Sequence, residues 1–96
     1  MLDTLTIDQF RPHLGQIFHI IVDGERLPVK LTDVFAWGSG DDRPRQPFSI
    51  IFHTVPQATV PQAVYRVESE VMEPLEIFLA PLEPDERGMR YEAVFT

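Results

Sequence analysis

Apolar and polar side chains alternate along several short segments of this chain, which is the pattern of a β-strand with one buried face. The alternation is clearest near the end of the sequence, where Met89, Tyr91, Ala93 and Phe95 are separated by Arg90, Glu92 and Val94. We therefore expect a terminal strand whose inner face completes the core, and not a dispensable tail.

Further runs rich in β-branched and aromatic residues predict additional strands. They cover residues 16–22, 27–37, 47–54, 63–69 and 75–81. The pair Asp23-Gly24 separates the first two runs and is a strong signal for a β-hairpin. The second run changes phase between Leu31 and Val34, which predicts a β-bulge near Thr32 or Asp33.

A short helix is expected before the first strand. Thr6 and Gln9 have the spacing of a capping box, and Pro12 and Gly15 limit the helix to one or two turns. Six or seven strands with short links and one short N-terminal helix predict a mainly β fold, a small antiparallel barrel or sandwich. The chain has 96 residues, which we expect to form one domain, 1–96.

Charge and composition exclude several classes of partner. Fifteen acidic and eight basic residues give a formal net charge of −7, and the basic residues are scattered singly. Nucleic acids and anionic membranes are bound by clustered Lys and Arg, so we expect neither as a partner. The chain has no cysteine, which excludes disulfides and thiolate chemistry, and we expect a cytoplasmic protein without an export signal or a membrane anchor.

No residue set with the spacing of a catalytic or metal site stands out. Ser49 and His53 share a strand face but are four residues apart, about 13 Å, which is too far for a nucleophile and its base. His13 and His19 add no metal-binding pair at short spacing. The glycines of residues 38–46 lack the Lys and the following helix of a phosphate-binding loop. We predict no catalytic residues, no metal and no cofactor.

Several predicted strands carry apolar residues on both faces, and a solvated face would be polar. We expect one set to point away from the face that holds Tyr91 and Phe95 and to form an interface. These residues are Phe18, Ile20, Ile51, Phe78 and Val94, with Val22 continuing the row. A homodimer is the simplest use of such a face. The alternative is that the N-terminal helix and the long loops cover it.

A second candidate site is a ligand-binding rim. Trp37 ends a predicted strand just before the loop at residues 38–46, and Arg43 and Arg45 follow within that loop. With Tyr65, these residues could bind a sugar or another small ligand, although a tryptophan in this position more often caps the core. A small-ligand or carbohydrate-binding β-barrel, conceivably an enzyme, is therefore the alternative function.

The chain also resembles a family of short bacterial proteins described as a domain of unknown function. The resembling residues are Leu5-Thr6, Phe10, Gly15-Gln16-x-Phe18, Pro47-Phe48-Ser49, Phe52, Tyr65-Arg66, Glu76-x-Phe78-Leu79-x-Pro81 and, most specifically, Gly88–Phe95. The resemblance implies a β-rich bacterial domain without characterised activity, and a gene neighbourhood beside phage-tail-collar-like proteins. We therefore expect a non-catalytic protein-interaction or assembly module, an accessory of a phage-tail-like or surface assembly.

Overall fold

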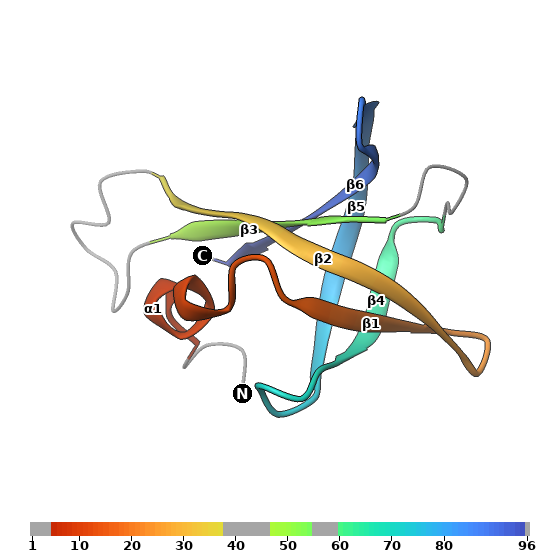
Figure 1. The fold of residues 1–96 in the computed structure, drawn as a ribbon, viewed down its shortest axis with the longest axis horizontal. Helices are drawn as coiled ribbons and strands as arrows, with labels where there is room; N and C mark the ends of the chain where they lie inside the picture. Colours follow the sequence, from red (N-terminus) through yellow and green to blue (C-terminus); the bar gives the residue numbers. More distant parts are fainter. Residues whose placement is uncertain (1–4, 38–46, 55–59, 96) are drawn as a thin grey trace.

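The structure is a computed structural model that describes residues 5–37, 47–54 and 60–95. It is mainly β, with one short helix that continues into a 3₁₀ turn before the first strand (Figure 1). The helical elements are α1 (Ile7–Phe10) and η2 (Arg11–His13), and the strands are β1 (Ile17–Val22), β2 (Glu25–Ala36), β3 (Phe48–His53), β4 (Ala63–Glu68), β5 (Leu75–Asp85) and β6 (Gly88–Phe95).

The six strands form a closed antiparallel barrel in the order β1-β2-β3-β6-β5-β4. Pairing between β1 and β4 closes the barrel, and pairing between β3 and β6 joins its two halves. Of the two architectures that the sequence predicted, the barrel is the correct one. Closure gives each of these strands a neighbour on both sides, so their backbone groups are used within the fold.

The β1–β2 hairpin and the β-bulge in β2 lie where the sequence predicted them. Asp23 has φ 51° and Gly24 has φ 81°, the positive angles that a tight two-residue hairpin requires. The β2–β3 register shifts between Leu31 and Asp33, so Thr32 is the extra residue of a β-bulge, as predicted. The bulge returns Val34 to the inner face after the alternation of the preceding residues is interrupted.

The core fills the inside of the barrel with side chains from every strand. Its aromatic part contains Phe10, Phe48 and Phe95, with the rings of Phe48 and Phe95 stacked at 4.7 Å. Tyr91 is fully buried, and Phe95 is 4% exposed. The predicted structural role of the terminal strand is therefore confirmed.

Helix α1 lies at one end of the barrel (Figure 1). The backbone N–H of Thr6 donates a hydrogen bond to Oε1 of Gln9 at 2.7 Å, which is half of the predicted capping box. Phe10 is fully buried against the aromatic pair of the core. The helix thus contributes its apolar side to the end of the core.

Two predicted boundaries are wrong by two residues or more, since β2 begins at Glu25 and not at residue 27, and β5 ends later than predicted. Strand β5 does not stop at residue 81 but continues to Asp85, with a register shift between Leu82 and Asp85. Residues 82–85, which the sequence predicted as part of a turn, therefore belong to a long β5–β6 hairpin, whose turn lies between Asp85 and Gly88. In the part of the chain that the structure describes, no helix is long and apolar enough to span a membrane.

Candidate functional site

The outer surface of the barrel carries a row of exposed apolar side chains. Val64 on β4 is 62% exposed and is paired with Phe78 on β5, which is 51% exposed. Val94 on β6 is 52% exposed. Phe78 precedes Ala80 by two residues and Val94 follows Glu92 by two, and Ala80 is paired with Glu92. Phe78 and Val94 therefore continue on the same side of the β5–β6 ladder.

The row extends from β6 across β3 to the end of β2. Ser49 on β3 is paired with Val94 on one side and with Phe35 on the other. The indole Nε1 of Trp37 donates a hydrogen bond to the Ser49 hydroxyl at 3.1 Å, so the Trp37 ring lies beside this small buried residue. Phe35 is 44% exposed, and Trp37 is 36% exposed. We call Val64, Phe78, Val94, Trp37 and Phe35 the outer row.

The outer row differs from the interface predicted from sequence. Phe18 and Ile20 are 1% and 0% exposed and belong to the core cluster with Tyr91 and Phe95. Their predicted outward orientation is therefore wrong, and Val22 also packs against the core. The reason is the phase of β1, in which His19 lies on the outer side together with Ile17 and Ile21.

Ile51 needs a different correction. It alternates with the inward-facing Ile50 and Phe52, as predicted, but it is only 5% exposed. Every residue of β3 is buried, including the outward-facing Ser49. Ile51 is therefore not available to a partner, and Phe78 and Val94 are the predicted interface residues that remain exposed.

The predicted ligand rim is not assembled from its described members. Trp37 lies on the outer side beside Ser49, whereas Tyr65 packs against the core, and its hydroxyl donates a hydrogen bond to the carbonyl oxygen of Pro61. Partial burial raises the pKa of Tyr65. Arg43 and Arg45 lie outside the described residues.

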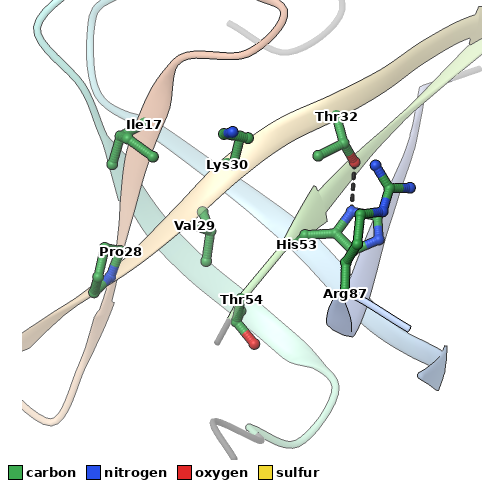
Figure 2. A pocket seen from close by; sticks show the side chains of 8 residues that line it. All are labelled: Ile17, Pro28, Val29, Lys30, Thr32, His53, Thr54 and Arg87. Carbon is green, nitrogen blue, oxygen red and sulfur yellow. Dashed lines mark hydrogen bonds between the residues drawn. The ribbon is translucent and has the colours of Figure 1, made fainter. Parts of the chain in front are cut away.

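A second feature of interest is an open cavity of about 450 Å³ beside the end of β3 (Figure 2). Its apolar lining comes from Ile17, Pro28 and Val29 of the β1–β2 hairpin. The remaining lining residues are polar or charged: Lys30, Thr32, His53, Thr54 and Arg87. The cavity therefore joins an apolar wall to a polar one, as small-molecule sites often do.

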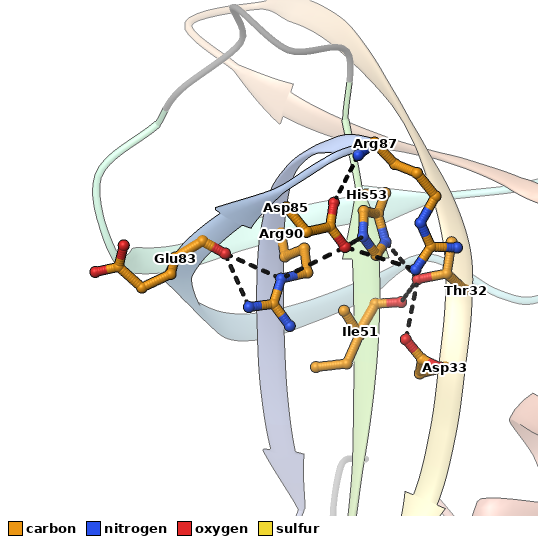
Figure 3. Close-up of polar contacts among 8 residues, drawn as sticks. All are labelled: Thr32, Asp33, Ile51, His53, Glu83, Asp85, Arg87 and Arg90. Atoms are coloured by element: carbon orange, nitrogen blue, oxygen red, sulfur yellow. Dashed lines mark hydrogen bonds and ion pairs between the residues drawn. The ribbon is translucent and has the colours of Figure 1, made fainter.

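His53 forms the centre of the polar wall (Figure 3). Its Nδ1 lies 2.5 Å from the hydroxyl of Thr32, and its Nε2 lies 2.9 Å from Oδ2 of Asp85. The His53 side chain is 6% exposed. These contacts connect β2, β3 and the end of β5, which are far apart in the sequence.

Asp85 determines how the hydrogens in this cluster are arranged. The hydrogen bond from His53 and, with smaller effect, the backbone N–H of Arg87 lower the pKa of Asp85 to about 2. As a carboxylate, Asp85 can only accept, so Nε2 of His53 carries a hydrogen. If the ring carries only that hydrogen, Nδ1 is the acceptor for the Thr32 hydroxyl. The β-bulge places Thr32 where it can donate to this nitrogen.

The order hydroxyl, imidazole and carboxylate is also that of a catalytic triad. In this protein, however, the Thr32 hydroxyl is half-buried and also lies 3.4 Å from both the Ile51 carbonyl oxygen and Oδ2 of Asp33. An oxyanion formed beside Thr32 would therefore face acceptors, which destabilise it. We interpret the hydrogen-bonded residues Thr32, His53 and Asp85, which we call the clasp, as a structural link between β2, β3 and β5.

Ser49 and His19 each contact a residue other than His53. Ser49 bonds to Trp37 and His53 bonds to Thr32, so the two do not form a nucleophile–base pair. His19 contacts Arg26 at 3.3 Å. Among residues 5–37, 47–54 and 60–95, no three His, Asp or Glu side chains are grouped as metal ligands would be.

Two parts of these sites were missed by the sequence analysis. Val64 lies two and four residues before Arg66 and Glu68 and therefore on the same face of β4 as these charged residues. This pattern could have identified Val64 as an exposed apolar residue. The contact of His53 with Asp85 spans 32 residues and has no local signal. The contact forms because β5 continues to Asp85, four residues beyond the predicted end of the strand.

Comparison with known proteins supports the resemblance seen in the sequence. The profile of a family described as "Domain of unknown function (DUF6916)" matches residues 5–95, nearly the whole chain. Searches of curated proteins and of solved structures found no match. This protein therefore belongs to the DUF6916 family, a domain of unknown function.

Proposed function

We propose that this protein is a non-catalytic interaction module that forms a homodimer through the outer row, as an accessory of a larger assembly of the phage-tail-like or surface type. The observation that carries the proposal is the exposure of Val64, Phe78 and Val94, three large apolar side chains on neighbouring strands. Full burial of such a side chain is worth about 1.5–3 kcal/mol, and roughly half of this is forgone by each side chain that is half exposed. Because the barrel is closed, contact through side chains is favoured over the addition of a strand.

The size of the row suits a dimer interface. Its members come from four strands of the barrel wall or their ends, and neighbouring strands lie about 4.8 Å apart. Because the barrel is closed, the row follows its curvature, and Val64, Phe78 and Val94 on the neighbouring strands β4, β5 and β6 form the part that faces a single partner. These three side chains are each more than half exposed, and an exposed apolar patch of a few hundred Å² is often a contact site on a monomer. A stable interface buries about 800 Å² per partner, of which somewhat more than half is apolar.

The charges beside the row favour a second copy as the partner. Arg66 and Glu76 are paired across β4 and β5, next to Val64 and Phe78. A two-fold axis through the row could place Arg66 of one copy opposite Glu76 of the other. The interaction of Arg66 with Glu68 at 2.6 Å lowers the pKa of Glu68, so this edge already holds alternating charges. A contact between Arg66 of one copy and Glu76 of the other would offset part of the repulsion expected from the net charge of −7.

The test is the oligomeric state of Phe78→Asp, measured by sedimentation velocity over a concentration series from micromolar to hundreds of micromolar. We expect the wild-type protein to be a dimer and Phe78→Asp to be a folded monomer, because Phe78 is half exposed and contributes little to the core. Leu14→Asp is the matched control, since Leu14 is 46% exposed but lies outside the row. It should leave the dimer unchanged.

A charge exchange tests the orientation of the two copies. Arg66→Glu should weaken the dimer, and the double variant Arg66→Glu with Glu76→Arg should restore it. A wild-type protein that stays monomeric at hundreds of micromolar would refute the homodimer. Equal weakening by Phe78→Asp and Leu14→Asp would show that the outer row is not the contact surface.

A further inference from the structure

The cavity beside His53 is lined in part by basic residues, with Asp85 and Asp33 close by. The chain has eight Lys and Arg residues, and three of them, Lys30, Arg87 and Arg90, lie at or next to this cavity. Arg90 donates two hydrogen bonds to the carbonyl oxygen of Glu83, at 3.0 and 2.8 Å, and is therefore engaged in the hairpin. Lys30 and Arg87 line the cavity itself.

These two cations have donors to spare. Arg87 has one long contact to Asp85, 3.6 Å, and its side chain is 65% exposed, so most of its five N–H groups remain available. Among the residues that the structure describes, none pairs with the ammonium group of Lys30. Asp85 does not serve Arg87 alone, because it also accepts a hydrogen bond from His53 and lies 4.0 Å from Arg90.

The opposite wall of the cavity is apolar (Figure 2). Ile17 is 48% exposed there, next to Pro28 and above the buried Val29. Ile17 and Lys30 are directly paired across β1 and β2, so the apolar wall and the Lys30 ammonium group are neighbours. An exposed isoleucine beside a lysine suits a ligand with a short hydrocarbon part next to a negative charge.

We propose that this cavity binds a small monocarboxylate, with its carboxylate on Lys30 and Arg87 and its hydrocarbon chain against Ile17 and Pro28. A planar carboxylate can accept two parallel hydrogen bonds from the Arg87 guanidinium. A single negative charge is favoured over a dianion such as phosphate, because Asp85 and Asp33 lie near the same wall. The site is independent of the outer row.

The proposal is tested with hexanoate as the probe, using amide NMR spectra of the full-length protein. We expect saturable shifts centred on Lys30, Thr32 and Thr54, with a Kd of about 1 mM, the affinity typical of so small a ligand. Hexylamine and 1-hexanol have the same chain without the negative charge and should bind at least tenfold more weakly. Shifts that rise linearly up to about 20 mM hexanoate, without saturation, would overturn the proposal.

Variants separate the head-group contact from general hydrophobic binding. Lys30→Gln and Arg87→Gln should each raise the Kd for hexanoate about fivefold to tenfold, in keeping with loss of one charge-assisted contact. Arg26→Gln is the matched control, because Arg26 lies on the same strand but does not line this cavity. An unchanged Kd in both cavity variants, or an equal loss in Arg26→Gln, would contradict the assignment.

Discussion

The hydroxyl group of Tyr91 offers a test of the core that removes a single atom. Tyr91 is fully buried, and its oxygen accepts a hydrogen bond from the backbone N–H of Val60 at 2.9 Å. Val60 is itself 7% exposed, so water does not readily replace the lost acceptor. Tyr91→Phe should therefore lower the free energy of unfolding by about 1–3 kcal/mol, the cost of leaving a buried donor without a partner.

Thermal unfolding followed by circular dichroism measures this effect. For a domain of this size, each kcal/mol lowers Tm by about 4–8 °C. Tyr65→Phe is the matched control, because the Tyr65 hydroxyl donates to an exposed carbonyl oxygen that water can satisfy, and its cost should stay below about 1 kcal/mol. Amide exchange should also accelerate at Val60 in Tyr91→Phe. Equal losses in the two variants would refute the argument that burial of the donor determines the cost.

Two further predictions concern the core and the clasp. Phe95→Ala removes a ring that stacks on Phe48 and should lower the free energy of unfolding by about 3–5 kcal/mol in urea titrations; an unchanged midpoint would contradict the structural role of β6. Asp85 has a pKa of about 2 in the folded protein, below its ordinary value of 3.8, so it stabilises the fold above pH 4 and this contribution is lost as the pH falls from about 4 to about 2. Asp85→Asn should therefore unfold at lower temperature than the wild type at pH 6, with the difference in Tm shrinking toward pH 2, and a constant difference would count against the His53–Asp85 contact.

The sequence was sufficient to predict the fold class because its local signals agree with one another. The Asp23-Gly24 pair fixed the first hairpin, and the phase change after Leu31 located the bulge. The inner face of the terminal strand was also correct, since Met89, Tyr91 and Ala93 alternate with the charged residues Arg90 and Glu92 and Phe95 continues the same phase. Local agreement of this kind specifies strands and turns directly.

The orientation of β1 could not be predicted in the same way, because nearly every residue from Ile17 to Val22 is apolar. Alternation identifies an inner face only when the other face is polar. The single polar residue, His19, marks the outer side, and the prediction gave it too little weight. The surroundings of His53 were hidden for another reason, since its partners Thr32 and Asp85 meet it through the barrel register and not through sequence spacing.

The two proposed surfaces can be tested separately because they lie at different levels of the barrel wall. Ser49 on β3 lies beside Val94 and Phe35 of the outer row. His53 lies at the cavity, four residues further along the same strand and on the same side of it. Four residues along a strand correspond to about 13 Å, beyond the distance at which substitutions usually influence each other. A partner bound to Phe78 and a carboxylate bound to Lys30 therefore need not compete. Failure of the dimer would leave the cavity proposal standing, and failure of hexanoate binding would leave the outer row as the surface to explain.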